Sequence, residues 1–282
     1  MVAEFLSEPE PLRGIPHKVA PGIIRIVAPN PSPMTYWGTN TYLIEGPEGL
    51  TVLDPGPDDA GHVQVILAVG TIRRILLSHT HSDHVDAVPA LRAATGAPVY
   101  AWHDAAGEFT PDVPLQEGSV VAGWTALHTP GHAPDHLCFA GPGGVLFSAD
   151  HVMAWSTSVV SPPHGSMTAY VASLDRLLAR NDSLYLPGHG PPLAAPRAYV
   201  EGLRAHRLAR EASILAVLGP EPVASRALTE RLYANTDRRL WRAAERNVLS
   251  HLDKLAAEGR ACRQGDGWLA SPSAATGTAP QR

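Results

Sequence analysis

Short apolar runs mark the first two thirds of the chain, and five of them end on a polar residue. They are residues 50–53 before Asp54, 75–78 before His79, 124–127 before the turn that holds His132, 145–147 before Asp150, and 184–186 before His189. Runs of this length, bounded by turn residues, predict buried strands. Because ligands bind beyond the carboxyl ends of strands in layered α/β sheets, we expect these polar ends to meet at one site.

Amphipathic segments alternate with the apolar runs. Residues 60–68, 86–94 and 168–179 carry apolar side chains at spacings of three and four, which predicts helices packed on the faces of a sheet. The alternation of strands and helices predicts an α/β fold.

The pattern changes after residue 196. Residues 190–196 hold three prolines, which cannot continue a helix or a central strand, so we place a domain boundary there. Beyond it, residues 199–218, 225–233 and 240–258 predict helices, and Asp266–Gly267 predicts a hairpin of residues 261–264 with 268–270. We therefore expect a large domain over 1–196, a small winged-helix-like domain over 197–270 and a disordered tail over 271–282.

Composition agrees with this organisation. A chain of 282 residues suits one large and one small domain, and 44% hydrophobic with 17% charged residues is ordinary for a globular protein. No apolar run approaches the ~18 residues of a membrane span, and the N-terminus lacks the basic and apolar regions of a signal peptide. We expect a cytoplasmic protein that does not enter the membrane. Cys138 and Cys262 are too few for a disulfide framework or a thiolate zinc site.

The net charge of −5 conceals an asymmetry. Residues 1–196 hold 8 Lys and Arg against 18 Asp and Glu, or −10, and residues 197–282 hold 14 against 9, or +5. Four arginines recur at spacings of three and four on the last predicted helix: Arg238, Arg239, Arg242 and Arg246. Such a stripe could bind phosphates, but acidic residues interleave with it and favour a solvated, salt-bridged face. It could equally support a homodimer or cap the larger domain.

The strongest chemical signal is the segment from His79 to His84, which places three imidazoles and one carboxylate within six residues after a predicted strand. His79 and His81 project to the same side of an extended chain and can share one metal. Asp83 and His84 follow the turn toward the next helix and can serve a second ion.

Three further ligand candidates, His132, Asp150 and His189, lie at other strand ends. The natural division puts His79, His81 and His132 on one metal and Asp83, His84 and His189 on the other, with Asp150 bridging. Imidazole and carboxylate ligands suit two Zn²⁺ ions, and manganese or iron could fit the same set. A hydroxide between the metals would be available at neutral pH, and we expect Asp83 to act as the catalytic residue that orients it and moves its proton.

The surroundings of this site are less clearly indicated. Asp54 and His136 could support ligand histidines, although Asp54 could equally cap the turn before Pro55 and Gly56. Four side chains could line the mouth and bind substrate, although aromatic residues more often belong to the core: Tyr36, Trp37, Trp155 and Thr157.

With these ligands aligned, the chain resembles the metallo-β-lactamase superfamily over roughly residues 20–192. Its pattern is His-x-His-x-Asp-His followed by a His, an Asp and a final His. Residues 30–34, 38–42, 129–136 and 187–191, together with the C-terminal segment, resemble the narrower β-lactamase-like protein 2 family. This resemblance implies an αββα sandwich with a C-terminal winged-helix domain and a dinuclear-metal hydrolase. It favours single-stranded RNA as the substrate, because the animal members resemble endoribonucleases.

Other functions stay open. Residues 151–160 differ from the animal members beside the site, and the chain has no room for the β-CASP insertion of larger ribonucleases. The alternatives are a thioester, ester or lactone hydrolase similar to glyoxalase II and the lactonases, a mononuclear-iron persulfide dioxygenase, and a non-catalytic RNA-binding protein. The flavodiiron reductases fit less well, because their pattern has Glu where this chain has His81.

Overall fold

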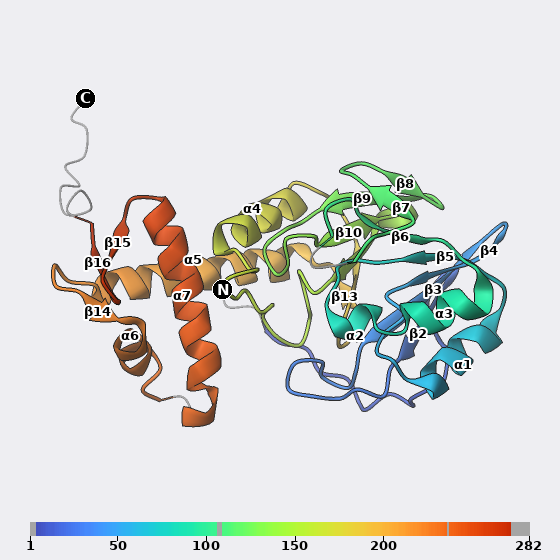
Figure 1. Cartoon of the computed structure of the whole chain (residues 1–282), viewed down its shortest axis with the longest axis horizontal. Helices are drawn as coiled ribbons and strands as arrows, with labels where there is room; N and C mark the ends of the chain where they lie inside the picture. Colours follow the sequence, from blue (N-terminus) through green and yellow to red (C-terminus); the bar gives the residue numbers. More distant parts are fainter. Residues whose placement is uncertain (1–3, 106–108, 236, 272–282) are drawn as a thin grey trace.

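The computed structural model describes residues 4–105, 109–235 and 237–271 (Figure 1). Two large β-sheets face each other in the larger part of the chain, and a smaller, mainly helical part follows. The predicted tail, residues 271–282, lies outside the described residues apart from Ser271.

The first sheet has seven strands in sequence order. Antiparallel pairing joins the first four strands, and parallel pairing with helical or loop crossovers joins the last four. The strands are β1 (His17–Ala20), β2 (Ile23–Val27), β3 (Asn40–Gly46), β4 (Gly49–Leu53), β5 (Ile72–Leu76), β6 (Val99–Trp102) and β7 (Val113–Leu115).

The second sheet has six strands, of which only β11 and β12 are parallel neighbours. In spatial order they are β13 (Leu193–Ala194), β12 (Leu184–Pro187), β11 (Val145–Ala149), β10 (Leu137–Ala140), β9 (Trp124–His128) and β8 (Val120–Val121). A short 3-10 helix, η1 (Pro142–Gly144), joins β10 to β11.

Apolar side chains from both sheets fill the space between them. Ile44 and Leu76 from the first sheet share one buried cluster with Phe139 and Phe147 from the second. Strand side chains alternate between the two faces of a sheet, so each sheet also presents an apolar outer face that needs cover.

Helices cover both outer faces. On the first sheet, Ile66 and Leu91 are buried from α1 (Ala60–Val69) and α3 (Val88–Thr95). On the second, α4 (Met167–Leu178) and α5 (Arg197–Val217) bury Tyr170 and Leu203. The result is the four-layer αββα arrangement that we expected. The predicted helix over 86–94 is preceded by a separate one-turn helix, α2 (Ser82–Val85).

The C-terminal module consists of the second half of α5, the helices α6 (Ser225–Leu232) and α7 (Trp241–Ala257), and a small sheet. The predicted hairpin is present as β15 (Ala261–Gln264) and β16 (Gly267–Ala270), and β14 (Val223–Ala224), which we did not predict, pairs with β16. Ile214 of α5 belongs to the core of this module, whereas Leu203 of the same helix belongs to the core under the second sheet. The predicted boundary between residues 196 and 197 falls where α5 begins, and this helix joins both cores.

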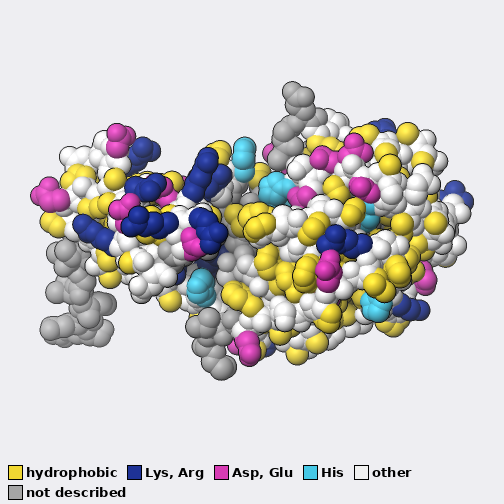
Figure 2. All heavy atoms as spheres, turned by 90° about the horizontal axis from the view of Figure 1, so that it is seen from below, with side chains coloured by type: hydrophobic (Ala, Val, Ile, Leu, Met, Phe, Trp, Pro, Cys, Tyr) yellow, Lys and Arg dark blue, Asp and Glu magenta, His cyan; other side chains and the backbone are white. Residues whose placement is uncertain are grey.

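The predicted arginine stripe does not lie on one helix, because α7 begins only at Trp241. Arg238 and Arg239 occupy a preceding 3-10 turn, η2 (Arg238–Leu240), which the side chain of Asp237 caps. Arg238 lies over the Trp241 ring, 5.3 Å from its centroid, so only Arg242 and Arg246 share α7. On the face shown in Figure 2, Lys and Arg side chains gather over the C-terminal module.

Within the described residues, no helix combines the length and the apolar character that crossing a membrane requires.

Burial of His62 predicts an acid-sensitive contribution to stability. Its side chain lies under the first sheet, and its Nε2 atom lies 2.9 Å from the Thr41 hydroxyl. Burial lowers the pKa of His62 from 6.5 to about 4, although Asp59 opposes the shift. Between these values the unfolded chain binds a proton that the folded chain does not, so the free energy of unfolding falls as the pH falls through this window.

We expect His62→Gln, which keeps a polar side chain but cannot titrate, to flatten this dependence between pH 6.5 and 4. The slope of the free energy of unfolding against pH should differ between the two proteins by up to roughly 1.4 kcal/mol per pH unit. Urea denaturation at each pH measures this slope. Identical slopes for the two proteins would show that His62 is not the group responsible.

Candidate metal centre

The seven predicted ligands meet at one edge of the sandwich. Asp150 directly follows β11, while His79 and His189 lie two or three residues beyond the ends of β5 and β12. His132 lies in the loop between β9 and β10, and α2 carries Asp83 and His84. The structure therefore brings together side chains that are up to 110 residues apart in the sequence, from His79 to His189.

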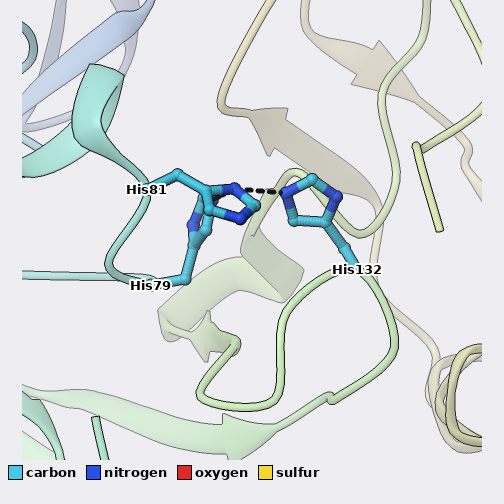
Figure 3. A group of neighbouring side chains, drawn as sticks. All are labelled: His79, His81 and His132. Carbon is cyan, nitrogen blue, oxygen red and sulfur yellow. Dashed lines mark hydrogen bonds between the residues drawn. The ribbon is translucent and has the colours of Figure 1, made fainter. Parts of the chain in front are cut away.

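The first ligand group consists of His79, His81 and His132, whose rings point toward one another (Figure 3). The Nδ1 atom of His81 lies 3.0 Å from Nε2 of His79 and 2.9 Å from Nε2 of His132. Zinc bound to imidazole at ~2.1 Å in a tetrahedral site separates its donor atoms by roughly 3.4 Å. A small outward relaxation of these rings would therefore admit a metal ion.

The second group consists of Asp83, His84 and His189. The Oδ2 atom of Asp83 lies 3.2 Å from Nε2 of His189 and 3.5 Å from Nε2 of His84. Asp150 reaches both groups, because its Oδ2 atom lies 3.4 Å from Nε2 of His189 and 3.6 Å from Nε2 of His132. This is the position that a bridging ligand needs.

Two buried atoms of the cluster make no hydrogen bond among the described residues, although they lie 3.5 Å from each other as an ion pair: Nε2 of His84 and Oδ1 of Asp150. Burying a polar atom without a partner costs free energy, and both atoms face the ligand groups rather than the core. Divalent cations at this position would satisfy them. The donor set and the geometry thus fit a metal centre with two ions.

The electrostatics of the first group suit metal binding. Burial holds the pKa of His79 well below 6.5, and the neighbouring His84 and His81 lower it further. Desolvation, assisted by His132, lowers the pKa of His81 to about 4. Both imidazoles are therefore neutral near pH 7, with lone pairs free for a cation.

The second group holds protons where cations would bind. Burial lowers the pKa of His189, but Asp150 and Asp83 outweigh burial and raise the pKa to about 9. Asp83 and Asp150 likewise raise the pKa of His84 against burial. The same attraction from His84 and His189 keeps the pKa values of both carboxyl groups low although burial opposes it. Metal binding must displace these protons.

The carboxylate of Asp54 supports two of the predicted ligand histidines. It accepts hydrogen bonds from the backbone N–H of Ser78 at 2.8 Å and the Ser78 hydroxyl at 2.6 Å, and it lies 3.0 Å from Nδ1 of His84. The Ser78 hydroxyl in turn lies 2.9 Å from Nδ1 of His79. One carboxylate therefore orients His84 directly and His79 through Ser78, as the supporting role predicted. Its side-chain hydrogen bonds in the described residues go to Ser78 and His84, and none goes to the turn at Pro55 and Gly56.

Backbone carbonyls orient two more ligands. Nδ1 of His189 donates to the carbonyl of Gly38 at 3.3 Å, and Nδ1 of His132 donates to the carbonyl of Val159 at 2.7 Å. In both rings this bond directs Nε2 toward the centre, where in His189 a metal would replace the Nε2 proton. Neither carbonyl could be predicted from the sequence, because any residue can supply one.

His136 does not support a ligand through a hydrogen bond within the described residues. Its Nδ1 atom lies 2.9 Å from the Thr129 hydroxyl, its Nε2 atom is buried without a partner, and its ring centroid lies 5.3 Å from that of His79. His151, which we did not predict, is also buried, and its ring centroid lies 5.7 Å from that of His136. Its place directly after Asp150 was the only available signal.

Two of the four predicted mouth residues are hydrogen-bonded to the N-terminal arm. The Tyr36 hydroxyl and the Trp37 indole N–H both bond the backbone of Glu8 at 3.1–3.2 Å. Tyr36 stacks on Trp155 with ring centroids 5.0 Å apart, and Thr157 is half-buried in the following loop. Tyr36, Trp37 and Trp155 lie together, but the polar atoms of Tyr36 and Trp37 are bonded to the N-terminal arm. Thr39, which we did not predict, donates to Oδ2 of Asp83 at 3.3 Å.

Comparison with known proteins relates both parts of the chain to known families. Residues 34–189 match the family model of the metallo-beta-lactamase superfamily, and residues 224–268 match that of the beta-lactamase associated winged helix domain. The Drosophila melanogaster beta-lactamase-like protein 2 homolog is 31% identical over 86% of this chain and 90% of its own length. An atrochrysone carboxyl ACP thioesterase of Passalora fulva is 28% identical over 86% of this chain and 78% of its own length.

The fold of both parts recurs in a solved structure. A beta-lactamase domain protein from Burkholderia ambifaria superposes with a TM-score of 0.79 over 93% of this chain and 95% of that one, at 21% identity.

A close approach at Gly188 makes this glycine indispensable to the centre. A Cβ atom there would lie 2.3 Å from Oδ1 of Asp150 and 2.9 Å from Cε1 of His84. We expect Gly188→Ala to displace these ligands and weaken zinc affinity at least ~10-fold, as measured by competition with a chromophoric chelator. Gly219→Ala, where the added atom meets nothing within 4 Å, is the matched control. Equal affinity in both variants would refute this geometry.

Removing the charge of Asp54 should lower the metal affinity of the same centre. Asp54 has a φ of 51°, which Asn tolerates, so Asp54→Asn changes the charge with little strain. We expect zinc affinity to fall roughly 10- to 100-fold, because His84 loses its anionic acceptor. Asp112→Asn removes a carboxylate paired with Arg92 elsewhere and should leave the affinity unchanged. A similar loss in both variants would count against a special role for Asp54.

Proposed function

Because the chain belongs to the metallo-beta-lactamase superfamily of hydrolase-type enzymes, we propose that it hydrolyses acyl thioesters with two divalent cations bound to its histidine and aspartate cluster. The observation that carries this choice of substrate is the exposed apolar surface on segments around the cluster, in a domain whose arginines are bonded to its own carboxylates and backbone. A carbonyl substrate with an apolar acyl group fits such a mouth better than a polyanion does.

We assign His79, His81 and His132 to one cation, Asp83, His84 and His189 to the other, and Asp150 to both. Zinc is the metal that we propose, since imidazole and carboxylate ligands suit it, and manganese or iron would fit the same donors. Bound there, the pair supplies water of lowered pKa and polarises the scissile carbonyl.

Asp83 is the proposed proton carrier. Its side chain is 28% exposed, whereas that of Asp150 is 9% exposed, so Asp83 is the acid of the cluster that a substrate can approach. Thr39 and His189 hold its Oδ2 atom, which leaves Oδ1 available to accept a proton and pass it to the leaving thiolate.

The apolar surface comes from four of the seven large hydrophobic side chains that are exposed in the described residues: Phe5, Leu6, Met34 and Val159. Leu6 donates its N–H to the carbonyl of Ala154, next to Trp155, and Val159 accepts from His132. Met34 precedes Tyr36, which stacks on Trp155. Val159 therefore lies directly beside a ligand, whereas Leu6 with its neighbour Phe5, and Met34, lie on segments bonded or stacked near Trp155. We propose that this exposed apolar surface holds an acyl chain.

The arginines of the larger domain do not offer a phosphate-binding track. Six of the seven within residues 1–196 form ion pairs with its own carboxylates: Arg13, Arg25, Arg74, Arg92, Arg176 and Arg180. The seventh, Arg73, donates to the backbone carbonyl of Glu48. RNA binding depends on neutralising phosphates with free cations, so this domain is poorly suited to it. Similarity to a protein described as a thioesterase supports the same choice.

Single-stranded RNA is the second candidate. The exposed arginines that gather on the C-terminal module favour it, because they could hold phosphates while a strand reaches the centre (Figure 2). A cytoplasmic location and a homodimer stay predictions.

One screen separates these candidates. With zinc-loaded protein we expect turnover of acyl-coenzyme A and acylglutathione thioesters that improves as the acyl chain lengthens, and little cleavage of lactones or single-stranded RNA. Cleavage of RNA without turnover of any thioester would contradict the proposal in favour of the second candidate. About one iron per chain with oxygen uptake on persulfides would contradict it in favour of a dioxygenase.

Two variants test the assigned roles. Asp83→Ala and His132→Ala should stay folded, as judged by circular dichroism, and lose at least ~100-fold in kcat with the best thioester. Asp112→Asn serves again as the control that should keep full activity. Unchanged kcat in either of the first two variants would exclude the mechanism.

A further inference from the structure

We infer that α5 and α7 set the position of the metal ligand His132, through arginines that hold the surface loop to which this histidine is bonded. The inference rests on the metal-ligand role of His132 in the proposed function. It assigns Arg246 and Arg207 as positioning residues, and it makes the C-terminal module a part of the metal centre.

The orientation of His132 depends on a loop without regular structure. Residues 150–166, all described, form neither helix nor strand, and we call them the 150–166 loop. Among the described residues, the His132 side chain makes one hydrogen bond to this loop, in which its Nδ1 donates to the carbonyl of Val159 at 2.7 Å. Val159 itself is 42% exposed, so packing of its side chain does little to fix that carbonyl.

Arginines from two helices hold the loop on both sides of Val159. Arg207 of α5 donates to the carbonyl of Ser158, the preceding residue. Arg246 of α7 donates to the hydroxyl of Ser161 and, at 3.2 Å, to the carbonyl of Pro162. The carbonyl that orients His132 thus lies between two points at which the loop is bonded to the C-terminal helices.

The two arginines are not equivalent. Arg207 is 2% exposed, and its guanidinium lies 5.2 Å from the centroid of the Tyr170 ring on α4, so it is part of the core between the helices. Arg246 is exposed, and both of its hydrogen bonds go to the 150–166 loop. Arg246 can therefore be changed with little effect on the core, which makes it the better probe.

A purely adhesive role for Arg246 predicts a different result from a positioning role. If Arg246 only fastens the module to the sandwich, its loss lowers the free energy of unfolding and leaves the metal centre unchanged. If it positions His132, its loss lets the Val159 carbonyl move, and the geometry at His132 changes even in a folded protein.

The test uses the full chain loaded with Co²⁺, whose visible absorption reports on ligand geometry. We expect Arg246→Ala to weaken Co²⁺ affinity roughly tenfold and to change the absorption spectrum. Arg246→Lys, which keeps a donor, should recover part of both. The control is Arg231→Ala, which removes an exposed arginine of α6 that has no ion pair or hydrogen bond with the other described residues.

Unchanged Co²⁺ affinity and spectrum in a folded Arg246→Ala protein would overturn the inference, whatever happens to stability. Should that variant fail to fold, Ser161→Ala removes one acceptor of the same contact, and its Co²⁺ affinity and spectrum decide in the same way. Because Co²⁺ binding is measured without substrate, failure of thioester turnover would refute the proposed substrate and leave this test intact.

Discussion

The structure depends on bringing five imidazoles and three carboxylates together at a largely buried edge between two sheets. Each charge there would be costly to bury alone, and the arrangement is tolerable because acids and imidazoles compensate one another. Asp54 contacts the ring of His84 on the side away from the proposed cations, and Asp150 lies close to both His132 and His189. Without metal the compensation relies on protons held by His84 and His189, and divalent cations in their place complete it with better-matched charge.

Much of this arrangement could be predicted from the sequence, because the strand that ends at a ligand carries two signals at once. An apolar run followed by His79 or Asp150 indicates both the buried strand and the polar group at its carboxyl end. The seven predicted ligands do lie together, and the resemblance to the metallo-β-lactamase superfamily and to β-lactamase-like protein 2 is confirmed. The two-residue strand β14 escaped prediction, since so short a run has no periodicity.

The features that the sequence could not reveal are those that depend on tertiary contact alone. A backbone carbonyl such as that of Val159 has no residue signature. The two hydrogen bonds from Arg246 go to Ser161 and Pro162, which precede it in the sequence by 85 and 84 positions. The arm that carries Glu8 occupies Tyr36 and Trp37, which composition alone marks only as aromatic. These contacts determine what the mouth offers a substrate, and they join the C-terminal helices to the centre through a helix, α5, that contributes to both cores.

Anomalous X-ray scattering from crystals grown with zinc tests the central claim most directly. The account predicts two peaks roughly 3.5–4 Å apart, one among His79, His81 and His132 and one among Asp83, His84 and His189, with Asp150 between them. A single peak, or peaks away from these side chains, would contradict it.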